Sequence, residues 1–147
     1  MEKEEIIRHL KNFFLENANR FGIGLAFFYG SWVKGFPRED SDIDIAIVFS
    51  METPSVDEFF RRITEISLLL SRKLNLEVNI IQIYEDFRKP MLYYNAIVQS
   101  IPVYIRNHEK YIRLRNEAIY HMEDFSILGL RWQHEVALKN LEDLEHA

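Results

Sequence analysis

The chain has 147 residues, of which 48% are hydrophobic and 28% are charged, and its net charge is −5 at pH 7. This length and composition predict one globular domain with a modest core, and the acidic balance argues against nucleic acid as a direct substrate, because neutralising phosphates requires a basic surface. The absence of cysteine excludes a disulfide framework and a thiolate metal site.

The sequence shows no pattern typical of a membrane protein or of export. No apolar run reaches the roughly 20 residues that a helix needs to span a bilayer. Residues 1–10, MEKEEIIRHL, are acidic and amphipathic, unlike a signal peptide. We therefore expect a cytoplasmic protein that does not bind a membrane.

Hydrophobic periodicity predicts alternating helices and strands. In chain order, the first half is expected to form a helix over 2–20, a buried strand over 25–29, a sharp turn from Gly30 to Gly35, a buried strand over 43–49, and a helix that Ser55 and Glu58 open as a capping box. The second half is expected to form a strand over 76–83, a helix from Pro90, a short strand over 102–106, and two helices after about residue 108 that are broken near 124–129.

This order of elements predicts an α+β fold, with a small mixed β-sheet, helices packed mainly on one face, and a C-terminal helical tail. We expect a single domain over 1–147, with a core of about 6–106 and C-terminal helices over about 108–145. The sequence allows two placements for Tyr93, Tyr94 and Trp132. They either pack in the core or form an exposed patch for a partner or a homo-oligomer.

Asp42 and Asp44 are two residues apart at the start of the strand over 43–49, so their side chains point to the same face. Two like charges side by side repel, and Asp44 lies in an apolar strand, where an unpaired charge is costly. A divalent cation between the carboxylates removes this conflict, and Mg²⁺ takes carboxylate oxygens together with substrate phosphates. The pair therefore predicts a site for a metal ion and phosphates.

The residues around this pair resemble a known family. Gly30, Ser31, Gly35 and the segment 41–44 (SDID) resemble the GSxxxG…[SD]DxD pattern of the polymerase-beta-type nucleotidyltransferase superfamily. The length and the order of elements resemble the minimal nucleotidyltransferase (MNT) branch, in which many proteins are antitoxins paired with a small helical HEPN-domain toxin. The resemblance implies a nucleotidyltransferase fold, with Mg²⁺ as the cofactor and ATP or another nucleoside triphosphate as the substrate.

Under this resemblance, Asp42 and Asp44 are the expected catalytic residues, because they would hold the metal ion that bridges the triphosphate oxygens. Ser41, immediately before them, belongs to the expected phosphate-binding set. Phosphoryl-type transfer depends mainly on positioning and charge neutralisation, so few protein groups are needed.

The same resemblance assigns the remaining phosphate contacts to the turn after the first strand. Gly30 permits a tight turn and the approach of backbone N–H groups to a phosphate. Ser31 offers its hydroxyl to the same triphosphate, and Gly35 permits close approach of the following backbone. Lys34 and Arg38 are expected to add positive charge near the phosphates.

The sequence departs from the family pattern at one position. The family usually carries a third carboxylate on the strand after the intervening helix, and here the matching residue is Asn79, which has an amide oxygen but no charge and is no base. Glu77 is the fallback third ligand if the strand shifts or bulges, since it lies on the same face about 6.6 Å along the strand. Trp32, also unusual for the family, either stacks on a base or packs in the core.

The favoured function is Mg²⁺-dependent transfer of a nucleoside monophosphate, AMP from ATP, onto a hydroxyl. By the resemblance, the acceptor is a HEPN-type toxin, and the protein acts as its antitoxin. The first alternative is an antitoxin that binds the nucleotide and the partner with little or no turnover, which Asn79 favours. The second is a small-molecule enzyme similar to the aminoglycoside nucleotidyltransferases, although these are usually longer.

Overall fold

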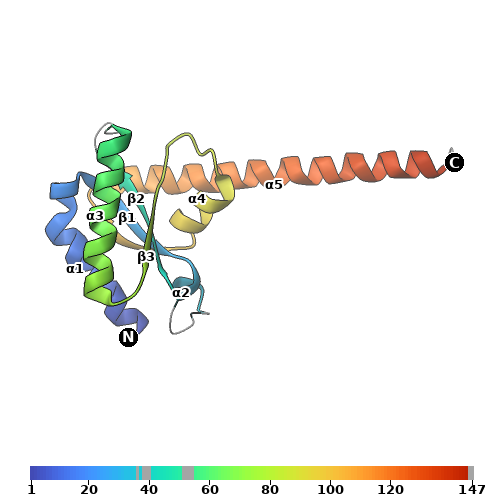
Figure 1. Cartoon of the computed structure of the whole chain (residues 1–147). Coiled ribbons are helices and arrows are strands. Elements are labelled where there is room, and N and C mark those ends of the chain that lie inside the picture. The colour runs from blue at the N-terminus through green and yellow to red at the C-terminus, as the bar shows by residue number, and fades with distance from the viewer. Residues whose placement is uncertain (36, 38–40, 51–54, 146–147) are drawn as a thin grey trace.

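The computed structural model describes residues 1–35, 37, 41–50 and 55–145 (Figure 1). In chain order, its elements are α1 (Lys3–Phe21), β1 (Ile23–Tyr29), α2 (Ser31–Lys34), β2 (Ile43–Phe49), α3 (Val56–Leu74), β3 (Val78–Gln82), α4 (Pro90–Ile97), β4 (Ile101–Ile105) and α5 (His108–Glu145).

The strands form one mixed sheet in the order β3-β2-β1-β4. β1 pairs antiparallel with both β2 and β4, whereas β2 and β3 are parallel and are connected through α3. Parallel neighbours need such a crossover, because a tight turn joins only antiparallel strands. The predicted α+β fold with a small mixed sheet is confirmed.

Helices cover both faces of the sheet, whereas the sequence analysis predicted that they would pack mainly on one. Alternate residues of β1 belong to different hydrophobic clusters: Phe28 packs with α1 and α3, and Phe27 packs with α4 and the first part of α5. The central strands are therefore buried on both sides, which explains why they are continuously apolar rather than alternating. This placement also puts Tyr93 in the core, where it is 2% exposed.

Local sequence signals placed most element boundaries well. β2 has the predicted bounds, and the Ser55 hydroxyl accepts a hydrogen bond from the Glu58 backbone N–H at the start of α3, as predicted. β3 is shorter than the predicted strand, and the predicted turn after β1 contains the single helical turn α2.

The C-terminal region is one continuous helix, so the prediction of two helices broken near 124–129 was wrong. Gly129 is the residue that favoured a break, but a glycine inside a helix costs only about 1 kcal/mol relative to alanine. No proline interrupts this region. α5 packs on the body through Leu114 and Ala118, and then extends away from it (Figure 1). Among the described residues, no helix combines the length and the apolar character that a membrane span needs.

Candidate nucleotide and metal site

The candidate site lies at the edge of the sheet where β1 ends and where β2 and β3 begin. Tyr29 of β1 pairs with Asp44 of β2, and Asp44 pairs with Asn79 of β3. Residues paired across neighbouring strands have side chains on the same face. These residues therefore form one row across the sheet, on the face that α4 and α5 cover further along the strands.

Asp42 and Asp44 are both partly buried at this edge, as their spacing predicted. The side-chain amide of Asn79 donates a hydrogen bond to Oδ2 of Asp42, with a nitrogen–oxygen distance of 3.0 Å. Asn79 thus touches the acidic pair through its donor group. The sequence placed these residues together correctly, because β2 and β3 run parallel in a regular register.

Burial raises the pKa of the Asp44 carboxyl, the hydrogen bond with Asn79 acts in the opposite direction, and the negative charge of Asp42 raises this pKa further. Within the described part of the chain, no lysine, arginine or histidine forms an ion pair with either aspartate. The charge of the pair is therefore not balanced by these residues, and the two carboxylates suit a divalent cation.

Gly30 is the residue that lets the turn approach Asp44. A Cβ atom added to Gly30 would lie 2.3 Å from Oδ2 of Asp44, so a side chain at this position would force the carboxylate to move. Gly30 also has φ 89° and ψ −156°, a region open almost only to glycine. The Asp44 carboxylate therefore lies directly against the backbone at the start of α2.

The short helix α2 is held by its own turn and by Trp32. The backbone N–H groups of Val33 and Lys34 both donate to the Gly30 carbonyl, at 3.1 and 3.0 Å. The indole Nε1 of Trp32 donates to the Ser41 carbonyl at 3.0 Å, which ties α2 to the chain entering β2. Trp32 is 8% exposed and belongs to the core, so it packs here rather than offering a free ring for a base.

The structure revises one role given to the turn. Among the described residues, no atom lies within 4 Å of a Cβ added to Gly35, so this glycine is not explained by close approach of backbone. Its φ of 88° explains it instead, since Gly35 ends α2 in the left-handed conformation. Ser31 and Lys34 lie on α2, which begins directly after Gly30, and Lys34 is exposed, whereas Arg38 lies outside the described residues.

The shift or bulge of the strand that would bring Glu77 to the metal site is not present in the described part of β2 and β3. Its backbone carbonyl accepts a hydrogen bond from the Ile43 N–H, and the β2–β3 register runs without a shift or bulge. In the described residues, no three side chains of His, Cys, Asp or Glu lie close enough to hold one metal ion. The described site therefore offers the two carboxylates Asp42 and Asp44, with the amide of Asn79 beside them.

Sequence reasoning missed Tyr29. Burial and the negative charge of Asp44 raise the pKa of its phenol to about 12, so Tyr29 stays protonated at neutral pH. It therefore presents a neutral hydroxyl group at the row that contains Asp44 and Asn79. Its position immediately before Gly30, at the end of a buried strand, is the signal that would have pointed to it.

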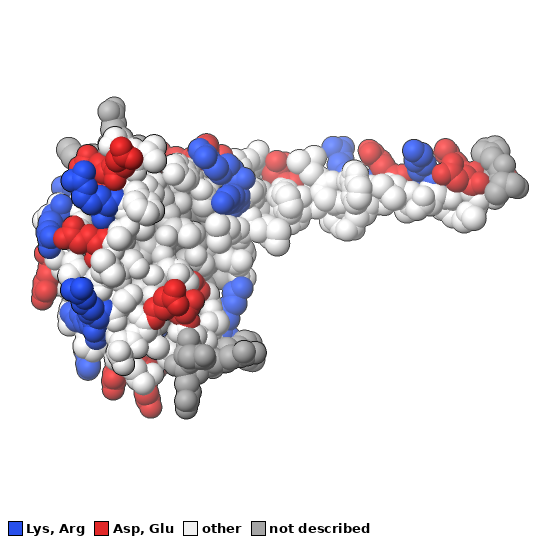
Figure 2. Space-filling view, viewed as in Figure 1, with Lys and Arg blue, Asp and Glu red and all other residues white. Residues whose placement is uncertain are grey.

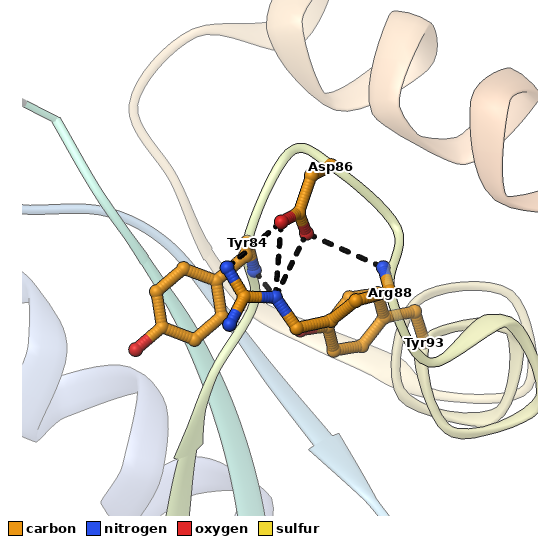
Figure 3. A network of polar contacts seen from close by, with 4 residues as sticks. All are labelled: Tyr84, Asp86, Arg88 and Tyr93. Carbon is orange, nitrogen blue, oxygen red and sulfur yellow. Dashed lines mark hydrogen bonds and ion pairs between the residues drawn. The ribbon is translucent and has the colours of Figure 1, made fainter.

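A second polar cluster lies beyond the other end of β3 (Figure 3). Arg88 forms an ion pair with Asp86 at 2.8 Å and lies 4.4 Å from the ring centroid of Tyr84, whose backbone N–H donates to the Tyr93 hydroxyl. Hydrogen bonding to Arg88 lowers the pKa of Asp86. These groups satisfy one another and hold the connection between β3 and α4.

Comparison with known proteins now decides the family. The profile of the family described as polymerase beta, nucleotidyltransferase, matches residues 8–109 of the chain. The chain belongs to this family. The matched residues include every element from β1 to β4, together with the row that contains Asp44 and Asn79. No curated protein matches the chain.

Solved structures with the same fold include antitoxin complexes. A toxin–antitoxin structure with AMP-PNP has a TM-score of 0.64 and 15% identity, over 86% of this chain and 97% of that chain. A complex of the tri-AMPylated HEPN toxin with the MNT antitoxin from Shewanella oneidensis has a TM-score of 0.61 and 13% identity, over 88% and 98% of the two chains. A structure assigned as a minimal nucleotidyltransferase has a TM-score of 0.52 and 27% identity, over 69% and 96%.

The contact between Gly30 and Asp44 predicts that alanine is tolerated less well at Gly30 than at Gly35. Gly35→Ala is the comparison: an added Cβ there meets nothing described, and its φ of 88° and ψ of 13° are left-handed helical, whereas Gly30, at φ 89° and ψ −156°, adds a backbone conformation that alanine tolerates less well to the contact with Asp44. We expect Gly35→Ala to lower the free energy of unfolding by about 1–2 kcal/mol, and Gly30→Ala to lower it by more. Denaturant unfolding measures both, and equal losses would contradict the proposed contact.

The raised pKa of Asp44 predicts that the site destabilises the metal-free fold at neutral pH. The penalty is absent below the unfolded pKa of about 3.9 and reaches its full size once the pH exceeds the folded pKa. Asp44→Asn should therefore raise the free energy of unfolding at pH 7 without Mg²⁺, and the gain should shrink as the pH approaches 4. Asp143→Asn, at an exposed position, is the control and should show no such gain. A gain for Asp44→Asn that is independent of pH would contradict the prediction.

Proposed function

We propose that this protein transfers AMP from ATP onto a hydroxyl group of a HEPN-domain partner and acts as the antitoxin of that partner in the cytoplasm. The observation that carries the proposal is the row of Asp44 and Asn79 with Asp42 beside it, set directly against the Gly30 turn. Family membership supports the reaction class. The solved complexes of antitoxins with a HEPN toxin or with AMP-PNP support the choice of partner and nucleotide.

Asp42 and Asp44 fit a divalent metal ion, because they are two carboxylates on one side of a strand without a cationic partner among the described residues. When bound, Mg²⁺ supplies positive charge that neutralises the triphosphate and the developing charge of the transition state. Asp42 and Asp44 bind and orient it. Since Gly30 has no side chain, the start of α2 stands close enough for a phosphate to contact both the turn and the metal-binding carboxylates.

The other residues of the site bind and orient the nucleotide. The Ser31 hydroxyl and the Lys34 ammonium are on α2, from which they reach the triphosphate, and Ser41 belongs to the same set. The acceptor hydroxyl oxygen attacks the α-phosphorus, and pyrophosphate leaves. The proton of that hydroxyl passes to solvent, because among the described residues Asn79 occupies the position where a third carboxylate would receive it.

The second candidate function is an antitoxin that binds the nucleotide and the partner but transfers AMP slowly or not at all. One observation favours it: the amide of Asn79 donates to Asp42, where a third carboxylate would accept a metal ion. An amide takes no proton from an attacking hydroxyl at neutral pH. The two candidates share the binding site and differ only in turnover.

The acidic pair can be tested by labelling. Asp42→Ala and Asp44→Ala should each lower the transfer of radiolabelled AMP from ATP to the HEPN partner by at least about a hundredfold, because each removes a carboxylate that would hold the metal ion whose positive charge stabilises the transition state. Asp57→Ala, at an exposed position of α3, should label the partner as the wild type does. Labelling that survives both site substitutions would refute the assignment of the site. Binding of ATP without labelling by the wild type would favour the second candidate.

The position of Asn79 can be tested by restoring a carboxylate. Asn79→Asp places a third negative charge beside Asp42, so we expect lower stability without Mg²⁺, a steeper Mg²⁺ dependence of stability, and faster transfer. Glu77→Gln is the control, because Glu77 lies two residues before Asn79 and outside the proposed site. It should change none of these quantities. Thermal unfolding over a Mg²⁺ titration and the labelling assay measure the effects. If Asn79→Asp leaves the Mg²⁺ dependence unchanged, residue 79 does not contribute to the metal site.

A further inference from the structure

The far part of α5, residues 123–145, is an exposed apolar helix that we call the tail. Every residue of the tail is exposed. Leu130 and Trp132 are 66% and 65% exposed, and Leu144 is 73% exposed. The tail projects from the body in Figure 1, and it adds no buried residue to either hydrophobic cluster. The described body therefore buries its core without the tail, and the apolar side chains of the tail need another explanation.

The apolar side chains of the tail form two seams with helical spacing. The first, which we call the Leu130 seam, contains Ile127, Leu130, Ala137, Leu138, Leu141 and Leu144. The second, which we call the Trp132 seam, contains Phe125, Leu128, Trp132 and Val136. Neighbours along a seam are three, four or seven residues apart, which is the pattern of a helix that packs against another helix. Because a helix turns about 100° per residue, the two seams lie on different sides of the tail.

The two seams are separated by two unlike edges. One edge carries most of the charged residues, namely Asp124, Arg131, Glu135, Lys139 and Glu142. Near the two ends of the tail, Glu123 and Glu145 lie on the side of the Leu130 seam, and Asp143 lies on the side of the Trp132 seam. The other edge is uncharged and carries the small residues Ser126 and Gly129, followed by Gln133 and Asn140. Figure 2 shows the same contrast, with charged side chains along one edge of the tail and uncharged atoms along the opposite edge.

The uncharged side of the tail continues onto the body as a pocket. Where α4 meets α5, a pocket of about 390 Å³ lies between Tyr94 and the α5 residues Ile119, Met122, Glu123, Ser126 and Ile127. Ser126 belongs to the uncharged edge and Ile127 to the Leu130 seam. The surface available to a partner thus extends from the tail to the body.

This arrangement fits a groove between two helices better than it fits one helix. A helix that lies in such a groove buries its deepest edge and a seam on either side, while the edge that faces solvent stays charged. The uncharged edge, with small residues that permit close approach, suits the deepest position. A second tail offers a single helix, so pairing two tails would leave one seam of each exposed.

The charge of the tail indicates the character of the groove. Its acidic residues are Glu123, Asp124, Glu135, Glu142, Asp143 and Glu145, and its basic residues are Arg131 and Lys139. Two tails would bring together the same excess of negative charge. A partner with lysine or arginine at the rim of its groove is complementary, and such complementarity speeds association and selects the partner.

We propose that the tail docks into an apolar groove between two helices of the partner protein, with basic residues of the partner at the rim of that groove, beside the charged edge. This inference rests on the proposed function only in taking the HEPN-domain protein as that partner. The site for ATP and the docking surface are then separate parts of the chain, one at the sheet edge and one on α5. This mode of recognition is that of an amphipathic helix in a hydrophobic groove.

Three neighbouring positions allow a matched test in the full-length chain. Leu130→Asp alters the first seam, Trp132→Asp alters the second, and Arg131→Asp places the same residue on the charged edge between them. The probe is a purified HEPN-domain protein that serves as the partner under the proposed function, and isothermal titration measures its affinity. We expect each seam variant to weaken binding at least tenfold, and Arg131→Asp to bind as tightly as the wild type or more tightly. Far-UV circular dichroism checks that each variant keeps its helices.

Sedimentation of the chain alone is the second arm of the test. We expect a monomer, whereas a dimer that Leu130→Asp dissociates would make a second copy the occupant and overturn the proposal. Equal affinity of the wild type and both seam variants would overturn it as well, as would the absence of binding. The labelling assay separates this inference from the proposed function: seam-dependent binding without labelling refutes the transfer alone, and labelling without seam-dependent binding refutes the docking alone.

Discussion

The approach of the Asp44 carboxylate to the backbone of Gly30 is the constraint on which the site depends. The end of β1, the start of α2 and the start of β2 meet at this contact, and an added Cβ at Gly30 would lie 2.3 Å from the carboxylate oxygen. Trp32 secures the same junction from the core side through its bond to the Ser41 carbonyl. Because the turn has no side chain here, a phosphate and a metal ion can share the space beside Asp44. The glycine, the serine and the paired aspartates of the sequence pattern are the residues that produce this geometry.

The acidic pair at this contact lowers the stability of the fold when no metal ion is bound. Burial raises the pKa of Asp44, and the charge of Asp42 raises it further, so the native state at neutral pH holds an acidic pair that has no cationic partner among the described residues. Asn79 reduces this conflict, since its amide donates a hydrogen bond to Asp42 where a third carboxylate would add repulsion. Under the proposed transfer, Asn79 also offers no base to the acceptor hydroxyl. The proposal therefore predicts that stability and turnover are opposed at this single position.

The body and the tail differ in what they bury and in what they expose. The body buries apolar residues on both faces of a mixed sheet, and its open edge presents the polar row. No described residue of the tail is buried, and the tail is apolar on two sides, which is the observation behind the docking that we propose. Under the proposed function, the small site would select the nucleotide and the larger surface of the tail would select the acceptor.

The sequence by itself determined the features that depend on local chemistry. The spacing of Asp42 and Asp44, the bounds of β2, the Ser55 cap and the identity of residue 79 all follow from patterns that span a few residues. The tertiary structure decided what depends on residues far apart in the chain: that helices cover both faces, that Tyr29 lies opposite Asp44, and that Trp32 packs in the core. It also decided that α5 is continuous, because the weak local preference of Gly129 against helix is smaller than the gain from extending an existing helix. Local backbone geometry sets the face of the strand to which each side chain points. The path of the whole chain sets which element packs against that face.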